Sequence, residues 1–467
     1  MEKYDLIVIG GGAGAFAAAI KANELGAKTA IINSGLPIGG TCVNVGCVPS
    51  KTLLHAAELL QTAKNHGVPG IELAVNKADY AAVVADELAL VEKLRNEKYE
   101  QVLKGLDNVS FIQGRAVFVS NDAVKVGEQH IEADKFIIAT GSTAIVPNIE
   151  GLNEAGYITH IEAMELKTVP ERLAVIGAGP VGLELGQLYA RFGSHVTILQ
   201  RAASIMPRAE PALTERLQQI LAGEGIGIKT GVELTKVVNK NGIKQLFYAS
   251  QAGDGVVEVD EILLAAGKAP NTGELNLMAA GVELNDKQAI VTQPNLQTSQ
   301  PHIFAVGDVT NLPLRLETTS GREGTYAAEN ALNGTSKSID YHSVPWAVFT
   351  DPQLASVGYT EDEQMAELKV CACRTLSFDK LPKSLITKRT EGLIKIAIHP
   401  ETKVIMGVHI LAPNASDLIA QAMVLIKNKN TIDDLDDMLP VFPTLSEAIK
   451  LAAMSFTRDV SKLSCCT

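Results

Sequence analysis

Two cysteines five positions apart, Cys42 and Cys47, carry the side chains best suited to redox or metal chemistry in this sequence. A regular α-helix rises about 1.5 Å per residue, so it would hold the two Cα atoms too far apart for a disulfide. A bond between them needs a distorted helical turn, which Gly40 and Gly46 permit and near which Pro49 removes a backbone donor. The spacing alone leaves a second interpretation open, in which both residues are buried apolar thiols.

A glycine-rich turn ahead of this segment predicts a dinucleotide-binding βαβ unit. Residues 6–9 and 29–32 are apolar runs typical of buried parallel strands, with a helical pattern between them. The turn has the spacing G-x-G-x-x-A and contributes Gly10, Gly12, Gly14 and Ala15. Such glycines let a pyrophosphate approach the N-terminus of the helix. Asn33 replaces the acidic residue usual at the end of the second strand, and it can still hydrogen-bond a ribose hydroxyl.

A second βαβ unit lies in the middle of the chain, which indicates a duplicated fold. Its strands are expected at residues 173–176 and 196–199. The turn between strand and helix contributes Gly177, Gly179 and Gly182. At the end of its second strand, Gln200 and Arg201 replace the acid that NAD requires, and Arg208 lies nearby. This exchange favours the 2′-phosphate of NADP, although both arginines could also be solvated surface charges.

The remaining pattern predicts an α/β chain with an α+β C-terminal part. Four turn or polar residues at strand ends suit cofactor binding: Thr140, Gly141, Gly267 and Asp308. After residue 341 strands and helices alternate without a nucleotide-binding pattern. Cys371 and Cys373 would face one side of a strand there, and we interpret them as packing residues because a metal pair would need further ligands.

Composition excludes several classes of protein. The 467 residues are 46% hydrophobic and 20% charged, which predicts folded domains with sizeable cores. The net charge of −12 disfavours nucleic-acid binding, which needs a basic face. Six cysteines are too few for a disulfide-stapled secreted chain. Neither a signal-peptide pattern nor an apolar run of membrane-spanning length is present, so we expect a cytoplasmic protein that does not enter a membrane.

Residues 39–51 resemble the redox segment of the pyridine nucleotide–disulfide oxidoreductases. Both glycine-rich units, Ala-Thr-Gly at 139–141 and Gly-Asp at 307–308 follow in the order typical of that family. The resemblance covers nearly the whole chain and implies FAD and NADPH as cofactors and a homodimer whose subunits share active sites. It implies three domains: FAD-binding (1–150 and 272–340), NADPH-binding (151–271) and dimerisation (341–467).

The resemblance also implies roles for individual residues. Cys42 would be the exchange thiol that faces the substrate, and Cys47 would lie against the flavin as a thiolate. Lys51 would lie near the flavin ring and pair with Glu184. The residues expected to bind FAD are Gly10, Gly12, Gly14, Ala15, Asn33, Gly40, Thr41, Lys51, Thr140, Gly141 and Asp308. Those expected to bind NADPH are Gly177, Gly179, Gly182, Arg201, Arg208 and Gly267.

The C-terminal segment distinguishes branches of this family. Phe442 stands where the disulfide reductases carry an acid/base histidine, and a hydrocarbon ring cannot move a proton. Glu447 thereby loses the usual partner of its carboxylate. The tail ends in Cys465 and Cys466, soft ligands that can capture Hg(II) from thiol complexes and pass it to Cys42 and Cys47. Together these features resemble the mercuric reductases; the alternatives are a thioredoxin-reductase-like enzyme and a non-catalytic thiol protein that sequesters metal.

Overall fold

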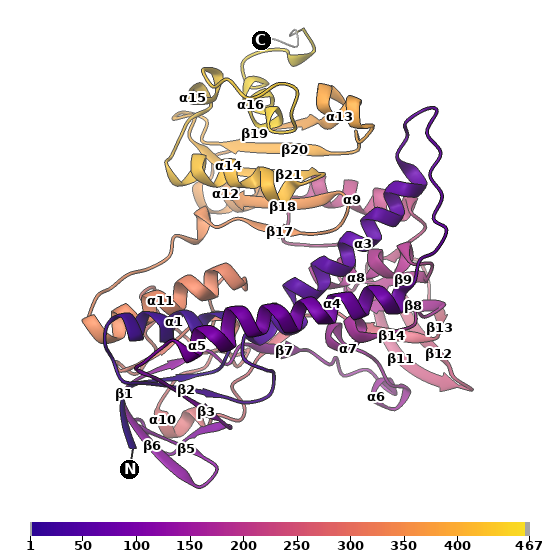
Figure 1. Ribbon diagram of the computed structural model, residues 1–467. Helices are drawn as coiled ribbons and strands as arrows, with labels where there is room; N and C mark the ends of the chain where they lie inside the picture. Colours follow the sequence, from indigo (N-terminus) through magenta and orange to yellow (C-terminus); the bar gives the residue numbers. More distant parts are fainter. Residues whose placement is uncertain (1, 463–467) are drawn as a thin grey trace. The chain divides into compact units, whose positions relative to one another are not determined.

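The computed structural model describes residues 2–462 of the chain (Figure 1). The described residues form two compact units. Unit 1 contains residues 2–52, 82–146 and 267–341, and unit 2 contains residues 53–81, 147–266 and 342–462. No helix within residues 2–462 is long and apolar enough to cross a membrane.

Unit 1 is built on a seven-stranded sheet with the order β3-β2-β1-β6-β5-β4, to which β16 adds beside β6. Its strands are β1 (Glu2–Ile9), β2 (Thr29–Asn33), β3 (Val109–Gln113), β4 (Ala116–Phe118), β5 (Ala123–Val126), β6 (Gln129–Ile138) and β16 (Ile303–Ala305). The strands β1, β2, β3, β6 and β16 are parallel, whereas β5 and β4 continue as an antiparallel hairpin. The first predicted βαβ unit is therefore present.

Both faces of this sheet are covered, which explains why the C-terminal parts of its central strands, residues 6–9 of β1 and 136–138 of β6, are apolar and buried. Helices α1 (Ala13–Glu24) and α11 (Glu317–Asn333) lie side by side, and their alanines pack with β1 and β6 in one core (Figure 1). A second core on other strand residues includes α10 (Leu277–Ala280). The rest of unit 1 comprises α2 (Gly40–Val45), the start of α3 (Cys47–Asn65), most of α4 (Tyr80–Arg95), the π-helix η1 (Asn96–Glu100), α5 (Gln101–Lys104), β7 (Ser142–Ala144), β15 (Lys268–Pro270) and the 3-10 turn η2 (Gly307–Val309).

Unit 2 contains the second βαβ unit, in a parallel sheet with the order β10-β9-β8-β14. An antiparallel sheet, β11-β12-β13, accompanies it. The elements are α6 (Leu152–Ala155), α7 (His160–Glu165), β8 (Arg172–Ile176), α8 (Pro180–Arg191), β9 (His195–Leu199), α9 (Pro211–Gly223), β10 (Gly227–Lys229), β11 (Val232–Lys240), β12 (Ile243–Ser250), β13 (Gly255–Val259) and β14 (Glu261–Leu264).

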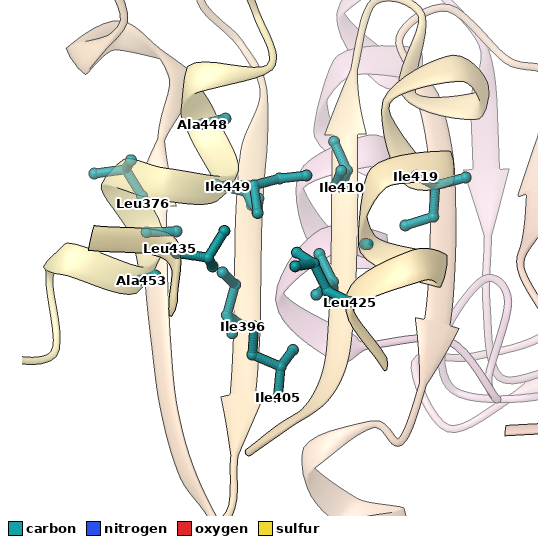
Figure 2. Packing of buried hydrophobic residues seen from close by; sticks show 14 of the residues in the cluster. Leu376, Ile396, Ile405, Ile410, Ile419, Leu425, Leu435, Ala448, Ile449 and Ala453 are labelled. Carbon is teal, nitrogen blue, oxygen red and sulfur yellow. The ribbon is translucent and has the colours of Figure 1, made fainter. Parts of the chain in front are cut away.

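The C-terminal part of unit 2 is an antiparallel sheet with the order β17-β18-β21-β20-β19. Its elements are η3 (Tyr341–Ser343), β17 (Trp346–Val348), β18 (Gln353–Gly358), α12 (Glu361–Leu368), β19 (Ala372–Ser377), η4 (Phe378–Lys380), α13 (Pro382–Thr387), β20 (Leu393–Ile398), β21 (Ile405–Ala412), α14 (Ala415–Lys427), α15 (Ile432–Asp436), α16 (Glu447–Met454) and η5 (Val460–Lys462). Alternate strand residues pack against α14 and α16, as Figure 2 shows for Ile396, Ile410, Leu425 and Ile449.

The two units differ from the predicted domain boundaries. The strand β15 pairs with β7, so residues 267–271 belong to unit 1, whereas the prediction includes them in the NADPH-binding domain. Residues 147–150, which the prediction includes in the FAD-binding domain, belong to unit 2. The division into three functional domains stays a prediction.

Candidate active site

The redox segment is a helix broken between its two cysteines. Cys42 lies in α2, and Cys47 is the first residue of α3. Gly46 separates the two helices, and a Cβ atom at this position would lie 2.8 Å from the carbonyl oxygen of Thr41. Only glycine fits this break, so the structure has the distorted turn that the cysteine spacing predicts.

The Cys42 side chain is half-buried, and the Cys47 side chain is exposed. A side-chain hydrogen bond with Cys47 raises the pKa of the Cys42 thiol, and burial raises it further. The carboxylate of Glu317 acts in the same direction. Cys42 therefore keeps its proton at neutral pH, and the pair does not carry two negative charges.

The backbone of the redox segment lies directly on the first glycine-rich turn. A Cβ atom at Gly40 would approach the Cα atom of Gly12 to 2.5 Å, and the Gly39 N–H donates to the carbonyl of Gly11 at 2.8 Å. Gly40 has a φ of +61°, which also favours glycine. The predicted residues Gly12 and Gly40 are thus brought together in unit 1.

A buried amide, which the sequence analysis missed, holds the entry to α2. The Nδ2 atom of Asn44 donates to the carbonyls of Pro37, Ile38 and Gly40 at 3.1, 3.2 and 2.8 Å. Arg95 donates to its Oδ1 atom at 3.2 Å. Asn44 thereby fixes the loop that carries Cys42. In the sequence, only its position between the two cysteines indicates this role.

The turn before α1 fits the pyrophosphate of a dinucleotide. Gly12 caps α1 without a side-chain hydrogen bond, so the first backbone N–H groups of the helix are left for an anion. Gly10 has a φ of +126°, and Ala15 is buried in the core behind the turn. At the end of β2, the Nδ2 atom of Asn33 donates to Leu36 at 3.0 Å, so its ribose contact stays a prediction that would use Oδ1.

Two distant stretches meet beside this turn, because β7 and β15 pair. The Thr140 hydroxyl donates to the Asn271 carbonyl at 2.8 Å, and Asn271 Nδ2 donates to the Thr140 carbonyl at 2.9 Å. Gly141 accepts from the Asn271 N–H at 2.9 Å, and Gly267 accepts from Ile145 N–H at 2.9 Å. Gly267, which we predicted to contact NADPH, is thus located in unit 1 with the residues predicted to contact FAD.

Asp308 has polar neighbours in unit 1 that the sequence did not reveal. Its Oδ2 atom accepts from the Ser142 hydroxyl at 2.6 Å. Burial lowers the pKa of the nearby Lys268 ammonium, although the negative charges of Asp308 and Cys47 oppose that shift. This set of donors and one carboxylate suits the hydroxyl and phosphate groups of a nucleotide cofactor.

A buried carboxylate supports the turn that presents Asp308. Glu323 is fully buried in α11; its Oε2 atom accepts from the Gly307 N–H at 2.7 Å, and Oε1 accepts from the Tyr341 hydroxyl at 2.8 Å. Burial raises the pKa of Glu323. The side chain therefore acts through Gly307, as a positioning residue.

Tyr99 is a further neighbour of the thiols that we did not predict. Its ring packs edge-on against Phe16, with centroids 4.9 Å apart. Burial raises the pKa of Tyr99 to about 12, and the charges of Cys42, Glu317 and Cys47 add to the shift. Tyr99 lies in the π-helix η1, a local geometry that is frequent at functional sites.

The second glycine-rich turn, in unit 2, fits a second dinucleotide. Gly179 caps α8 without a side-chain hydrogen bond, and Pro180 is the first helical residue. A Cβ atom at Gly182 would overlap the carbonyl oxygen of Gly177, so the helix and turn require glycine there. At the end of β9, Gln200 Oε1 accepts from the Ala178 N–H at 3.3 Å.

The predicted determinants of nucleotide choice lie next to this turn. Arg201 and Arg208 both have exposed side chains in the segment that follows β9. Glu184 is buried in α8, and its Oε1 atom accepts from the Phe349 N–H at 2.8 Å. The predicted pairing of Glu184 with Lys51 stays a prediction.

The C-terminal segment has a local explanation for Glu447. This residue begins α16, and its Oε2 atom accepts from the Thr444 N–H at 2.9 Å, so it caps the preceding turn without a histidine. Phe442 is 48% exposed. Cys465 and Cys466 lie outside the described residues. Among residues 2–462, no group of three or more His, Cys, Asp or Glu side chains could hold a metal ion.

Comparison with known proteins agrees with this geometry. Residues 4–333 match the family model described as pyridine nucleotide-disulphide oxidoreductase, and residues 344–453 match its dimerisation domain. The chain is 39% identical to the mercuric reductase of Staphylococcus aureus over 99% of this chain and 84% of the relative. It is also 39% identical to that of Streptomyces lividans, over 99% of this chain and 98% of the relative.

Solved structures with the same fold include the HOCl-induced flavoprotein disulfide reductase RclA from Escherichia coli, in its Cu(II) complex. The TM-score is 0.87 at 27% identity, over 98% of this chain and 100% of that one. The predicted fold class is confirmed, as are the prediction of an enzyme and that of a flavin and a pyridine nucleotide as cofactors. The chain belongs to the pyridine nucleotide-disulphide oxidoreductase family.

Proposed function

We propose that this enzyme reduces Hg(II), delivered as a thiol complex, to elemental mercury with electrons from NADPH. The relatives named mercuric reductase, at 38–39% identity over nearly the whole chain, support this substrate. The observation that carries the proposal is Phe442, an exposed aromatic residue where the disulfide reductases carry a histidine. Reduction of a disulfide needs an acid for the leaving thiolate, whereas reduction of a bound metal ion does not.

The dithiol of Cys42 and Cys47 would receive the metal ion. Two S–H bonds break, two S–Hg bonds form, and the protons pass to the two thiols that leave the Hg(II) complex. FAD and NADPH, when bound, supply the two electrons that convert Hg(II) into elemental mercury. In the net reaction one NADPH, one proton and one Hg(II) dithiolate complex give NADP⁺, elemental mercury and two thiols.

The residues around the dithiol have distinct tasks in this proposal. Asn44 and the Gly40–Gly12 contact hold the backbone that presents Cys42. Tyr99 would shield the half-buried Cys42 thiol from water, whereas the Cys47 thiol is exposed and open to the incoming metal complex. The N-termini of α1 and α8 would bind the pyrophosphates of FAD and NADPH, with Asp308 and Ser142 nearby in unit 1.

Delivery of the metal would use the C-terminal cysteines and a second subunit. Residues 344–453 match a dimerisation domain, which supports a homodimer whose C-terminal domain completes the active site of the partner. Cys465 and Cys466 would capture Hg(II) from small thiols and transfer it by ligand exchange. Such exchange needs reduced thiols, so the cytoplasm is the compartment that fits this function.

A comparison of electron acceptors tests the proposal. Purified protein should be yellow, and it should oxidise NADPH when the Hg(II)–cysteine complex is added. Oxidation with thioredoxin, oxidised glutathione or Cu(II), but not with Hg(II), would refute the proposal. A colourless protein that binds Hg(II) without NADPH oxidation would instead support sequestration.

The tail gives a separate prediction. Replacing both Cys465 and Cys466 by Ala should lower kcat/KM for the Hg(II)–cysteine complex by about 100-fold, because the first ligand exchange then loses its two-thiol advantage. Reduction of the flavin by NADPH, followed by stopped-flow absorbance, should stay unchanged. Equal turnover of the variant and the parent with several thiol ligands would contradict the relay.

The nucleotide preference is tested at the turn after β9. Replacing Arg201 and Arg208 by Ala should lower kcat/KM for NADPH by about 10- to 100-fold and leave that for NADH unchanged, because only NADPH carries the 2′-phosphate. Lys240, an exposed cation of unit 2 on β11, provides the control in Lys240→Ala. Equal kcat/KM for the two nucleotides in the parent protein would already exclude the predicted preference.

A further inference from the structure

Cys371 and Cys373 form a second pair of thiols, at the edge strand of the C-terminal sheet. Cys371 directly precedes β19, and Cys373 pairs with Ala397 of β20. The strand β19 lies beside β20 (Figure 1) and forms the edge of the sheet. Successive side chains of a strand point to opposite faces. Leu376 and Ala372 pack toward the core under α14 and α16, as Figure 2 shows for Leu376. Cys371 and Cys373 therefore share the opposite face.

The two half-buried thiols lie beside an ion-pair cluster. Burial raises the pKa of both thiols, and the charges of Glu361 and Lys395 also act on each of them. Thr375, on the same face of β19, lies opposite Lys395 of β20. The Lys395 ammonium donates to Glu210 at 2.5 Å and to Glu361 at 2.6 Å. Two carboxylates thus surround one ammonium next to the thiols.

Neither a redox disulfide nor a reactive nucleophile suits this arrangement. In an extended strand, Cα atoms two positions apart are about 6.6–6.8 Å apart, at the upper end of the range that a disulfide spans. Burial raises the pKa of Cys373, and its hydrogen bond with Cys371 adds to that shift, whereas reactive cysteines have a lowered pKa. The pair is therefore a neutral dithiol whose two side chains lie two positions apart on one face of the sheet edge.

We propose that Cys371 and Cys373 bind one Hg(II) ion between their sulfur atoms. Binding breaks two S–H bonds and forms two S–Hg bonds. When Hg(II) arrives as a complex with two small thiols, the two protons pass to those leaving thiols. No electrons are transferred, and the metal stays Hg(II).

Ligand number selects the metal at this site. Zinc in a structural site takes four protein ligands, and no set of three or more metal-binding side chains exists in the described chain. Hg(II) prefers two thiolates in a nearly linear arrangement, so it needs no further ligand. The lack of further ligands near Cys371 and Cys373 in the sequence disfavours metal ions that need three or four ligands. It does not disfavour a two-coordinate ion.

Charge points to the same ion. Replacing two thiol protons by one Hg(II) leaves the site neutral, whereas Ag(I) or Cu(I) between two thiolates would add one negative charge. In addition to burial, the negative charge of Glu361 raises the pKa of both thiols and that of Glu210 raises the pKa of Cys371, and the Lys395 ammonium only partly offsets these charges. A divalent ion is therefore favoured over a monovalent one.

This inference does not rest on the proposed function, since Cys371 and Cys373 would bind Hg(II) whether or not Cys42 and Cys47 support its reduction. The test uses the full chain with the other four cysteines replaced by serine, at positions 42, 47, 465 and 466. This background variant is mixed with the Hg(II)–cysteine complex and desalted in excess cysteine. It should retain one Hg(II) per protomer, measured by atomic absorption.

Single variants locate the site within that background. Cys371→Ser and Cys373→Ser should each lower the affinity for Hg(II) by about 100-fold, because the second S–Hg bond is no longer intramolecular. Ala372→Ser, which keeps both thiols, is the matched control and should bind as the background does. Circular dichroism and retained FAD check that each variant is folded.

Two outcomes would overturn the inference. The first is a folded background variant that retains no Hg(II) after the cysteine wash. The second is equal retention when both Cys371 and Cys373 are replaced by serine. Displacement of Hg(II) by an equal concentration of Ag(I) would contradict the argument from charge.

Discussion

Replacing Cys42 by Ser should reduce Hg(II)-dependent oxidation of NADPH by at least about 1,000-fold, because the substrate then meets one thiol where two are needed. Cys47→Ser should have the same effect on turnover. The measurement is steady-state oxidation of NADPH with the Hg(II)–cysteine complex. The turn at residues 10–15, which we propose binds FAD, is untouched by either change, so both variants should stay yellow.

The half-reaction with NADPH provides the internal control for both variants. Flavin reduction by NADPH should persist in Cys42→Ser, because the nucleotide turns at α1 and α8 are intact. A variant that turns over Hg(II) at the parental rate while lacking Cys42 would show that the metal is reduced elsewhere. Loss of FAD from Cys42→Ser would indicate a folding defect, and Cys42→Ala then provides the second measurement.

A large loss of stability is expected for Gly324→Ala in α11. A Cβ atom here would overlap the carbonyl oxygen of Gly14 in α1 and lie 3.1 Å from the backbone nitrogen of Ala18. Both atoms belong to the backbone of α1, so the overlap cannot be relieved by the rotation of a side chain. The change should destabilise unit 1 by about 3 kcal/mol or more. It should lower the temperature at which FAD fluorescence is released.

Gly321→Ala is the matched control, one helical turn earlier in α11. A Cβ atom at Gly321 would meet nothing within 4 Å. Alanine at this position should therefore leave stability unchanged or raise it by roughly 0.5–1 kcal/mol, through the smaller entropy of the unfolded chain. Similar release temperatures for the two variants would show that the α1–α11 contact is looser than the structure indicates.

The sequence predicts the nucleotide-binding parts well because their signals are local. Gly10 and Gly12 lie within one turn between an apolar strand and a helix, and the same pattern recurs at Gly177 and Gly179. Each turn can therefore be predicted without knowledge of distant residues. The break between Cys42 and Cys47 can be predicted for the same reason, since Gly46 lies between them.

Residues whose partners are remote in sequence could not be predicted. In the sequence, Glu323 is one charged residue within a helical pattern. Its partners Gly307 and Tyr341 are 16 and 18 positions away, so the local pattern does not indicate them. Tyr99 approaches the thiols only because η1 packs on residues of α1. The position of residues 267–271 in unit 1 could not be predicted, because β15 pairs with β7, more than a hundred residues earlier in the chain.

The contact between Gly40 and Gly12 has a consequence for the evolution and engineering of this enzyme. A Cβ atom at Gly40 would lie 2.5 Å from the Cα atom of Gly12, whereas a Cβ atom at Gly12 would lie 3.8 Å from the Cα atom of Gly40, an ordinary contact. A side chain at position 40 therefore requires the backbone of residues 10–12 to move. A chimaera that takes only the cysteine segment from a relative would place it against a first glycine-rich turn that it does not fit. The two loops should therefore be exchanged together, in a segment that begins before the first turn and includes α1.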